Sequence, residues 1–91
     1  MSNFPGGSVY SMVQSISSGV FVVTERSFKR LAPGELQQLG LELEKQIRTV
    51  RGEQPPIDDT AAIQDRQRRI QRLNLALTML RAHQQKRKPK G

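Results

Sequence analysis

The residues best suited to chemistry in this chain are the basic ones near its C-terminus. From Arg66 to Gly91 the sequence has nine Lys and Arg and no Asp or Glu. Most of the cations in the helical part of this stretch are Arg, whose planar guanidinium matches a phosphate or a carboxylate. We therefore expect contact with an anionic partner through Arg66, Arg68, Arg69, Arg72, Arg81, Lys86, Arg87, Lys88 and Lys90.

The spacing of three of these arginines predicts a shared surface. On a helix, Arg68, Arg69 and Arg72 fall on the side away from the main apolar stripe. The lysines and the arginine of 86–90 extend the same positive field past the end of the helix. The alternative is a solvated face whose C-terminal cations suit the helix dipole. Nine cations without one acid favour a binding surface.

Residues that could support catalysis or metal binding are sparse. His83 is the only histidine, and the chain has no cysteine. A His near the basic end of a helix is typically a solvated surface residue. Glu42 and Glu44 point to nearly opposite sides of a helix, and Asp58 and Asp59 suit helix capping. We expect no enzyme activity, no cofactor and no metal site.

The net charge of +7 is unevenly distributed. Residues 1–65 carry six basic and eight acidic groups, giving −2, and residues 66–91 carry nine basic groups, giving +9. Such asymmetry indicates an anionic partner, such as nucleic acid, an acidic protein surface or an anionic membrane. No aromatic residue lies among the basic ones, which argues against stacking on RNA bases and favours phosphate contact. An interfacial membrane helix would also need Trp or Phe there.

The first 24 residues carry no charged side chain, but they do not resemble a membrane span. Six serines, three glycines and a proline interrupt them, and they lack the basic start of a secretory signal. We expect a soluble protein without a membrane span, in the cytoplasm.

Composition predicts one small domain with loose ends. Leu, Ile, Val and Phe make up 23 of 91 residues, enough for a thin core. We expect a disordered N-terminus over 1–8, a single domain over 9–86, and a disordered basic C-terminal tail over 87–91. Within the domain we expect an N-terminal segment over 9–31 and two long helices over 33–51 and 58–86.

Apolar periodicity predicts that the two helices form an antiparallel αα-hairpin, so the fold is mainly α. The first helix starts at Pro33, suited to a first helical position, and ends before Gly52. Two prolines in the connector break the helix, and the second helix is longer, projecting by roughly 14 Å at its basic C-terminal end. The stripes expected to pack together are Leu36, Leu39, Leu43, Ile47 and Val50, and Ile63, Ile70, Leu73, Leu77 and Leu80.

The N-terminal segment has a pattern that fits more than one structure. VFVVT, residues 20–24, is β-branched and aromatic, which predicts a short strand. Residues 9–18 fit either a short helix ending at Gly19 or a strand joined to VFVVT by a turn. In the second long helix Leu75, Met79 and Ala82 form another apolar stripe, which we expect to be a protein interface. Either residues 9–28 or a second molecule, including another copy in a homo-oligomer, covers it.

These patterns predict a small, basic, non-enzymatic binding protein. The expected partner is RNA or a nucleoprotein complex, held through the basic helix and tail. The alternative is a protein–protein adaptor or assembly factor that docks on a larger complex through its helical hairpin and N-terminal segment.

Overall fold

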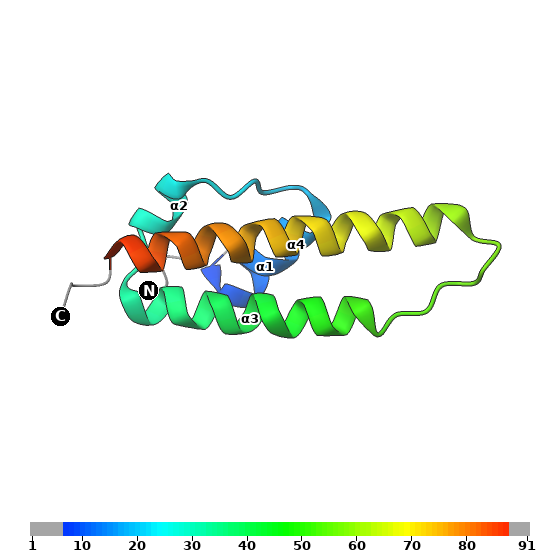
Figure 1. The fold of residues 1–91 in the computed structure, drawn as a ribbon, viewed down its shortest axis with the longest axis horizontal. Helices are drawn as coiled ribbons and strands as arrows, with labels where there is room; N and C mark the ends of the chain where they lie inside the picture. The colour runs from blue at the N-terminus through cyan, green and yellow to red at the C-terminus, as the bar shows by residue number, and fades with distance from the viewer. Residues whose placement is uncertain (1–6, 88–91) are drawn as a thin grey trace.

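The computed structural model describes residues 7–87, of which residue 87 is described by its backbone alone. It has four helices within that range: α1 (Val9–Ser18), α2 (Glu25–Lys29), α3 (Pro33–Arg51) and α4 (Thr60–Arg87). α3 and α4 lie side by side and antiparallel, as the predicted hairpin requires (Figure 1). α1 packs against both of them, and α2 packs against α4. The mainly α prediction is confirmed.

α3 occupies the predicted residues. Pro33 is in its first turn, and the Glu35 carboxylate accepts a hydrogen bond of 2.8 Å from the Ala32 N–H. This side chain satisfies a backbone donor that the helix start leaves without a partner. Every residue of the predicted first stripe is buried, so that face of the hairpin is as expected.

α4 begins at Thr60, two residues after the predicted start. The Asp59 carboxylate accepts a hydrogen bond of 3.0 Å from the Ala62 N–H, so this aspartate has the capping role expected of it. In the predicted second stripe Leu73, Leu77 and Leu80 are buried, whereas Ile63 and Ile70 are only partly buried.

The longer helix projects at the opposite end from the one predicted. The Arg66 side chain reaches carbonyl oxygens at the end of α3, so the first turns of α4 extend beyond α3. At the other end the start of α3 and the last turn of α4 lie at the same level (Figure 1). The prediction assigned the extra length of the second helix to its C-terminal end. The connector with Pro55 and Pro56 instead runs outward before α4 begins.

The N-terminal segment contains helices and no strand. Residues 9–18, for which helix and strand were both open, form α1. The Ser8 hydroxyl accepts a hydrogen bond from the Ser11 N–H, and Gly19 ends the helix with φ of 85°, a left-handed conformation that favours glycine. Ser8 therefore has an ordered capping role, although the predicted disordered N-terminus included it. The rest of that prediction, apart from Gly7, lies outside the described residues.

The predicted strand at 20–24 is wrong. The chain bends at residues 20 and 21, and among the described residues no neighbouring strand pairs with residues 22–24. The segment instead links α1 to α2 along α4 (Figure 1). α2 was not predicted. Its start at Thr24 is fixed by reciprocal contacts with Ser27, a capping box with Ser in place of the usual Glu.

The core includes all four helices. Met12 and Val13 of α1 and Phe28 of α2 are fully or almost fully buried, together with Leu31 before α3. The N-terminal third of the chain therefore supplies part of the core and covers one side of the hairpin. Of the predicted basic tail at 87–91, Arg87 is the last residue of α4, and residues 88–91 lie outside the described residues.

Candidate functional site

Arg66 joins α4 to the end of α3. Its Nε donates to the carbonyl oxygens of Val50 (3.2 Å) and Glu53 (2.9 Å), and its Nη2 donates to that of Arg51 (2.7 Å). The last carbonyls of a helix lack partners within the helix and carry its negative dipole end. A guanidinium placed there satisfies both requirements, so Arg66 has a structural role in the folded chain.

Arg69 is also held internally. Its two terminal nitrogens donate to both carboxylate oxygens of Glu53, at 2.6 and 3.2 Å, and its Nε lies 3.0 Å from the Asp65 carboxylate. Hydrogen bonding to Arg69 lowers the pKa of the Glu53 carboxyl, and Coulombic attraction to Arg69 and Arg66 adds to this effect. The same hydrogen bonds to Glu53 raise the pKa of Arg69.

Arg72 connects α4 to α1. Its Nη1 donates a hydrogen bond of 3.0 Å to the Ser17 carbonyl oxygen. The guanidinium also packs against Gly19, where an added Cβ would lie 3.0 Å from Arg72 Cζ. The positive φ favours glycine at residue 19, and an added Cβ would also require a small shift of the Arg72 guanidinium.

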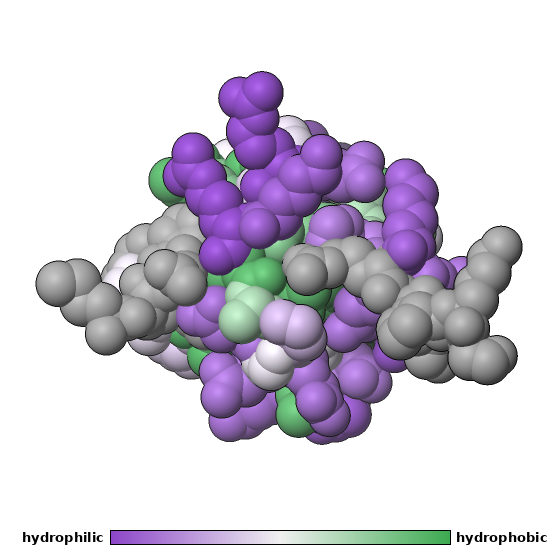
Figure 2. All heavy atoms as spheres, turned by 90° about the vertical axis from the view of Figure 1, so that its left-hand side faces the viewer, coloured by the Kyte–Doolittle hydropathy of each residue, from purple (hydrophilic) through white to green (hydrophobic). Residues whose placement is uncertain are grey.

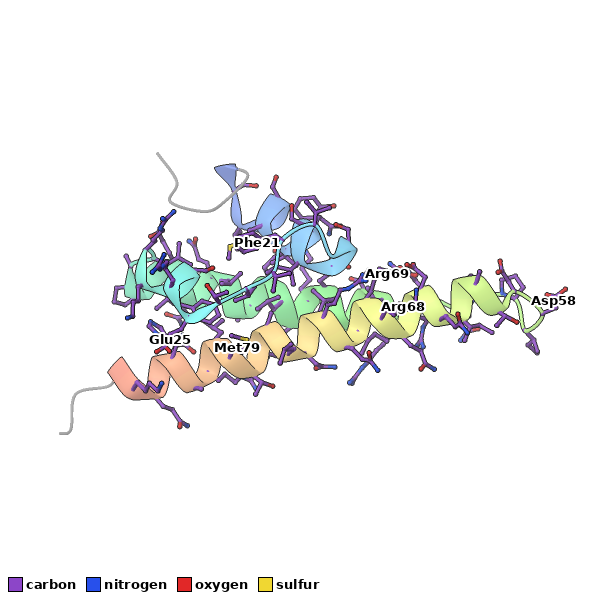
Figure 3. The ribbon with its side chains drawn as sticks, turned by 90° about the horizontal axis from the view of Figure 1, so that it is seen from above. Phe21, Glu25, Asp58, Arg68, Arg69 and Met79 are labelled. Atoms are coloured by element: carbon purple, nitrogen blue, oxygen red, sulfur yellow. The ribbon has the colours of Figure 1, made fainter. Side chains whose placement is uncertain are left out.

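The expected surface of three arginines is therefore not present in that form. Arg69 and Arg72 are partly buried in internal contacts, whereas Arg68 is exposed and has no ion pair or hydrogen bond to another described residue. Figure 3 labels Arg68 and Arg69, adjacent residues in very different surroundings. The helical wheel predicted that these three arginines point away from α3. Two of them are nevertheless covered, because Arg69 faces the connector and Arg72 faces α1.

The remaining predicted cations lie toward the C-terminal end of α4. Arg81 is paired with Glu44 at 3.4 Å, and Lys86 is paired with Glu25 at 3.4 Å. Both are exposed, so these pairs are solvated and weak. The Arg87 side chain, Lys88 and Lys90 lie outside the described part of the structure.

A second group of cations, missed in the sequence, lies beside this end of α4. Arg26 and Lys29 of α2 and Arg30 just after it are exposed and have no partner among the described residues. α2 lies next to the last turns of α4, where the buried Phe28 packs on His83 and Glu25 pairs weakly with Lys86. Figure 2, which views this end, shows strongly hydrophilic side chains projecting where α2 lies. We call Arg26, Lys29, Arg30 and Lys86 the basic end.

The sequence did contain a signal for the basic end. ERSFKR, residues 25–30, has three cations and one acid within six residues. Residues 1–65 together carry a net charge of −2, which hides this local excess of cations, so only the fold reveals its position beside the last turns of α4.

His83 is not the solvated surface residue that was predicted. Its side chain is 5% exposed, and its ring lies 5.5 Å from that of Phe28, centroid to centroid. Nδ1 is 3.9 Å from a Glu25 carboxylate oxygen, too far for a hydrogen bond, and neither ring nitrogen has a hydrogen-bond partner among the described residues. The unpredicted α2 covers this part of α4, which explains the difference.

The predicted interface stripe on α4 lines an apolar groove. Leu75 is 62% exposed, Met79 is half-buried and Ala82 is exposed. Residues 19–23 cover one side of the stripe, so the N-terminal segment covers it only in part. The groove has a volume of about 160 Å³ and lies between that segment and α4, with Phe21 and Met79 on its two sides (Figure 3).

The described residues contain no group of three or more His, Cys, Asp or Glu side chains that could hold a metal ion. Within the same range, no helix is long and apolar enough to cross a membrane. Comparisons with protein-family models, with curated proteins and with solved structures give no match for this chain.

Proposed function

We propose that the protein binds the phosphate backbone of RNA, alone or in a nucleoprotein complex, through the basic end. The observation that carries the proposal is the position of the unpaired cations. Arg66, Arg69 and Arg72 are used within the fold, whereas the cations of α2 project into solvent beside the last turns of α4.

The charge balance around the basic end supports this proposal. Residues 86–90 contain four cations in the sequence, and Lys86, the one whose side chain the structure describes, lies beside α2, where it is paired with Glu25 at 3.4 Å. Cations that replace condensed counterions on nucleic acid gain affinity without reading the sequence. Since no aromatic residue is interleaved with them, we expect contact with phosphates rather than with bases.

A salt series tests this function. Binding of fluorescently labelled RNA, single-stranded and duplex, and of duplex DNA is measured by anisotropy between about 50 and 200 mM salt. The logarithm of the affinity should fall linearly with the logarithm of salt. For the variant with Arg26, Lys29 and Arg30 all changed to Gln, the slope on duplex DNA should be smaller by about 2–3 units, because each lost phosphate contact removes about 0.9.

A matched variant on α3 provides the control. Lys45, Arg48 and Arg51 are also exposed, and changing them to Gln removes the same charge from a different surface. This control should retain most of the wild-type slope. If the two triple variants behave alike, only net charge matters and the basic end is not the site. Absence of any salt-dependent binding by the wild type would rule out the nucleic-acid function.

The second candidate function is a protein–protein adaptor. The observation that favours it is the apolar groove beside Leu75, an uncovered apolar surface on an otherwise polar helix face. Capture from the native cell after nuclease treatment tests it, with Leu75→Glu compared with Leu41→Glu. These two leucines are equally exposed, at 62%, on different helices. A specific partner should be lost only with Leu75→Glu.

A further inference from the structure

The groove beside Leu75 is suited to one large apolar side chain. Its volume of about 160 Å³ is close to that of an apolar cavity that can hold a benzene ring. Its lining is mostly apolar and comes from α1, the segment after it and α4: Ile16, Gly19, Phe21, Val22, Val23, Arg72, Leu75, Ala76 and Met79.

The part of the wall formed by residues 22–24 has the properties of an unpaired edge strand. The chain bends at residues 20 and 21 and then continues without a helix to Thr24, whose backbone is extended; Val22 is 75% exposed and Val23 is buried. Val22 and Val23 make no backbone hydrogen bond to another described residue. Extended backbone with free N–H and C=O groups can accept an added strand, while a neighbouring pocket selects its side chains.

The charges at the groove favour an acidic occupant. Arg72 is part of the lining, and Arg68 lies one turn earlier on the same side of α4, exposed and without a partner in the described chain. No acidic residue follows Asp65 on α4, and residues 7–24 contain none. A carboxylate placed beside Arg68 would therefore gain a charge-assisted contact without displacing an existing partner among the described residues.

We propose that the groove binds an extended acidic segment of another protein, which inserts one large apolar side chain next to Leu75 and Met79. Its backbone pairs with residues 22–23, and its carboxylates lie beside Arg68 and Arg72. This inference rests on the adaptor function and is independent of the basic end. A second copy of the chain fits less well, because its own segment 20–24 has no carboxylate and each copy carries a net charge of +7.

The test uses a panel of synthetic acidic peptides with nuclear magnetic resonance of the full-length protein. The peptides are rich in Asp and Glu and carry one central Leu, Met or Phe. Resonances of residues 19–23 and 72–79 should shift, and hydrogen exchange at the Val22 and Val23 amides should slow. A peptide with Ala at the centre should bind about tenfold more weakly or worse, since it loses the burial of the apolar side chain.

Two matched pairs of variants locate the site. Leu75→Glu should remove peptide binding, whereas Leu41→Glu should not. Arg68→Glu should weaken binding of acidic peptides several-fold, whereas Arg48→Glu, an equally unpaired exposed arginine on α3, should have little effect. Each of the four side chains is exposed, so the fold should be retained in all variants, and circular dichroism checks this.

Three results would overturn the inference. The first is the absence of resonance shifts at residues 19–23 with every peptide of the panel. The second is an equal loss of peptide binding with Leu75→Glu and with Leu41→Glu. The third is a wild-type dimer, seen by sedimentation, that Leu75→Glu dissociates. The last result would assign the groove to a second copy. If the peptides fail while cellular capture still depends on Leu75, the adaptor function stands and only the acidic chemistry of the partner is wrong.

Discussion

At the scale of single residues, neighbouring arginines of α4 have different roles that their type does not reveal. Arg66 donates three hydrogen bonds to backbone carbonyls, Arg69 pairs with Glu53, and Arg68 between them extends into solvent. All three arginines were candidates for anion binding because they share a residue type and lie in the same stretch without Asp or Glu. Only the fold shows that the C-terminus of α3 lies within reach of Arg66 and that Glu53 lies within reach of Arg69.

Substitution of Arg66 and Arg68 should separate these roles. Arg66→Ala should lower the free energy of unfolding by about 1–3 kcal/mol, because it leaves the carbonyls at the end of α3 without their charged donor. Arg68→Ala should change it by less than about 0.5 kcal/mol, as expected for an exposed charge. Urea unfolding measures both. Equal effects would show that the Arg66 contacts contribute no net stability in solution.

The Glu53–Arg69 pair should make stability depend on pH in the acid range. Because folding lowers the pKa of Glu53 from its ordinary value of 4.5, its contribution is complete above that value. It is lost as the pH falls through the lower pKa of the folded state. The Glu53 side chain is 43% exposed, so solvent screening limits the contribution to below about 1 kcal/mol.

Glu53→Gln tests that contribution. Between about pH 6 and pH 3, the wild type should lose more unfolding free energy than the Gln variant, since only the wild type must protonate Glu53. The other carboxylates are common to both proteins, so their effects cancel in the comparison. Parallel pH profiles would mean that the pair does not persist in solution.

At the scale of elements, the long helices were predictable and the short ones were not. Leu36 to Val50 recur at helical spacing, and Pro33 and Gly52 mark the ends, so local signals and packing agree for α3. α2 has five residues and no apolar period, and its stability comes from Phe28 entering the core. For residues 20–24 the β-branched pattern predicted a strand, but the chain bends at residues 20 and 21 and no described strand lies beside it.

The docking of α2 on α4 contains a polar side chain without a partner. Both ring nitrogens of His83 are buried without a hydrogen bond to the described residues, and the ring packs on Phe28. An unsatisfied buried group costs about 1–3 kcal/mol. His83→Leu at about pH 8 should therefore leave the free energy of unfolding unchanged or raise it by about 1 kcal/mol.

His83→Lys is the contrasting variant, because it places a full charge at the same buried position. We expect it to weaken α2 docking and to lower stability by several kcal/mol. Thermal and urea unfolding compare the three proteins. A clear loss of stability with His83→Leu would show that the imidazole does have a partner in solution, such as an ordered water.

At the scale of the whole molecule, the N-terminal third of the chain contributes both to the distribution of surface charge and to the hydrophobic core. α2 brings its cations next to the last turns of α4, which the division into residues 1–65 with a charge of −2 and residues 66–91 with +9 did not predict. α1 fills the space over the hairpin with Met12 and Val13, both fully buried. The hairpin, predicted as the body of the protein, therefore has a core that is incomplete without α1.

This sharing of the core predicts that α1 and the hairpin unfold together. Met12→Ala should cost about 2–5 kcal/mol, as much as Leu43→Ala in α3 or Leu73→Ala in α4, because all three side chains are fully buried. The exposed Leu41→Ala is the control and should cost less than about 0.5 kcal/mol.

Tyr10 provides a probe of α1 alone, since it lies in that helix and is the only tyrosine of a chain without tryptophan. Circular dichroism reports mainly α3 and α4, which contain 19 and 28 residues. In urea, the Tyr10 fluorescence and the circular dichroism should change in one coincident transition, in the wild type and in Met12→Ala alike. If the Tyr10 transition occurs at a lower urea concentration than the circular dichroism transition, and Met12→Ala shifts only the Tyr10 transition, then α1 detaches first. The hairpin would then be the stable unit, and the groove beside Leu75 would open as α1 leaves.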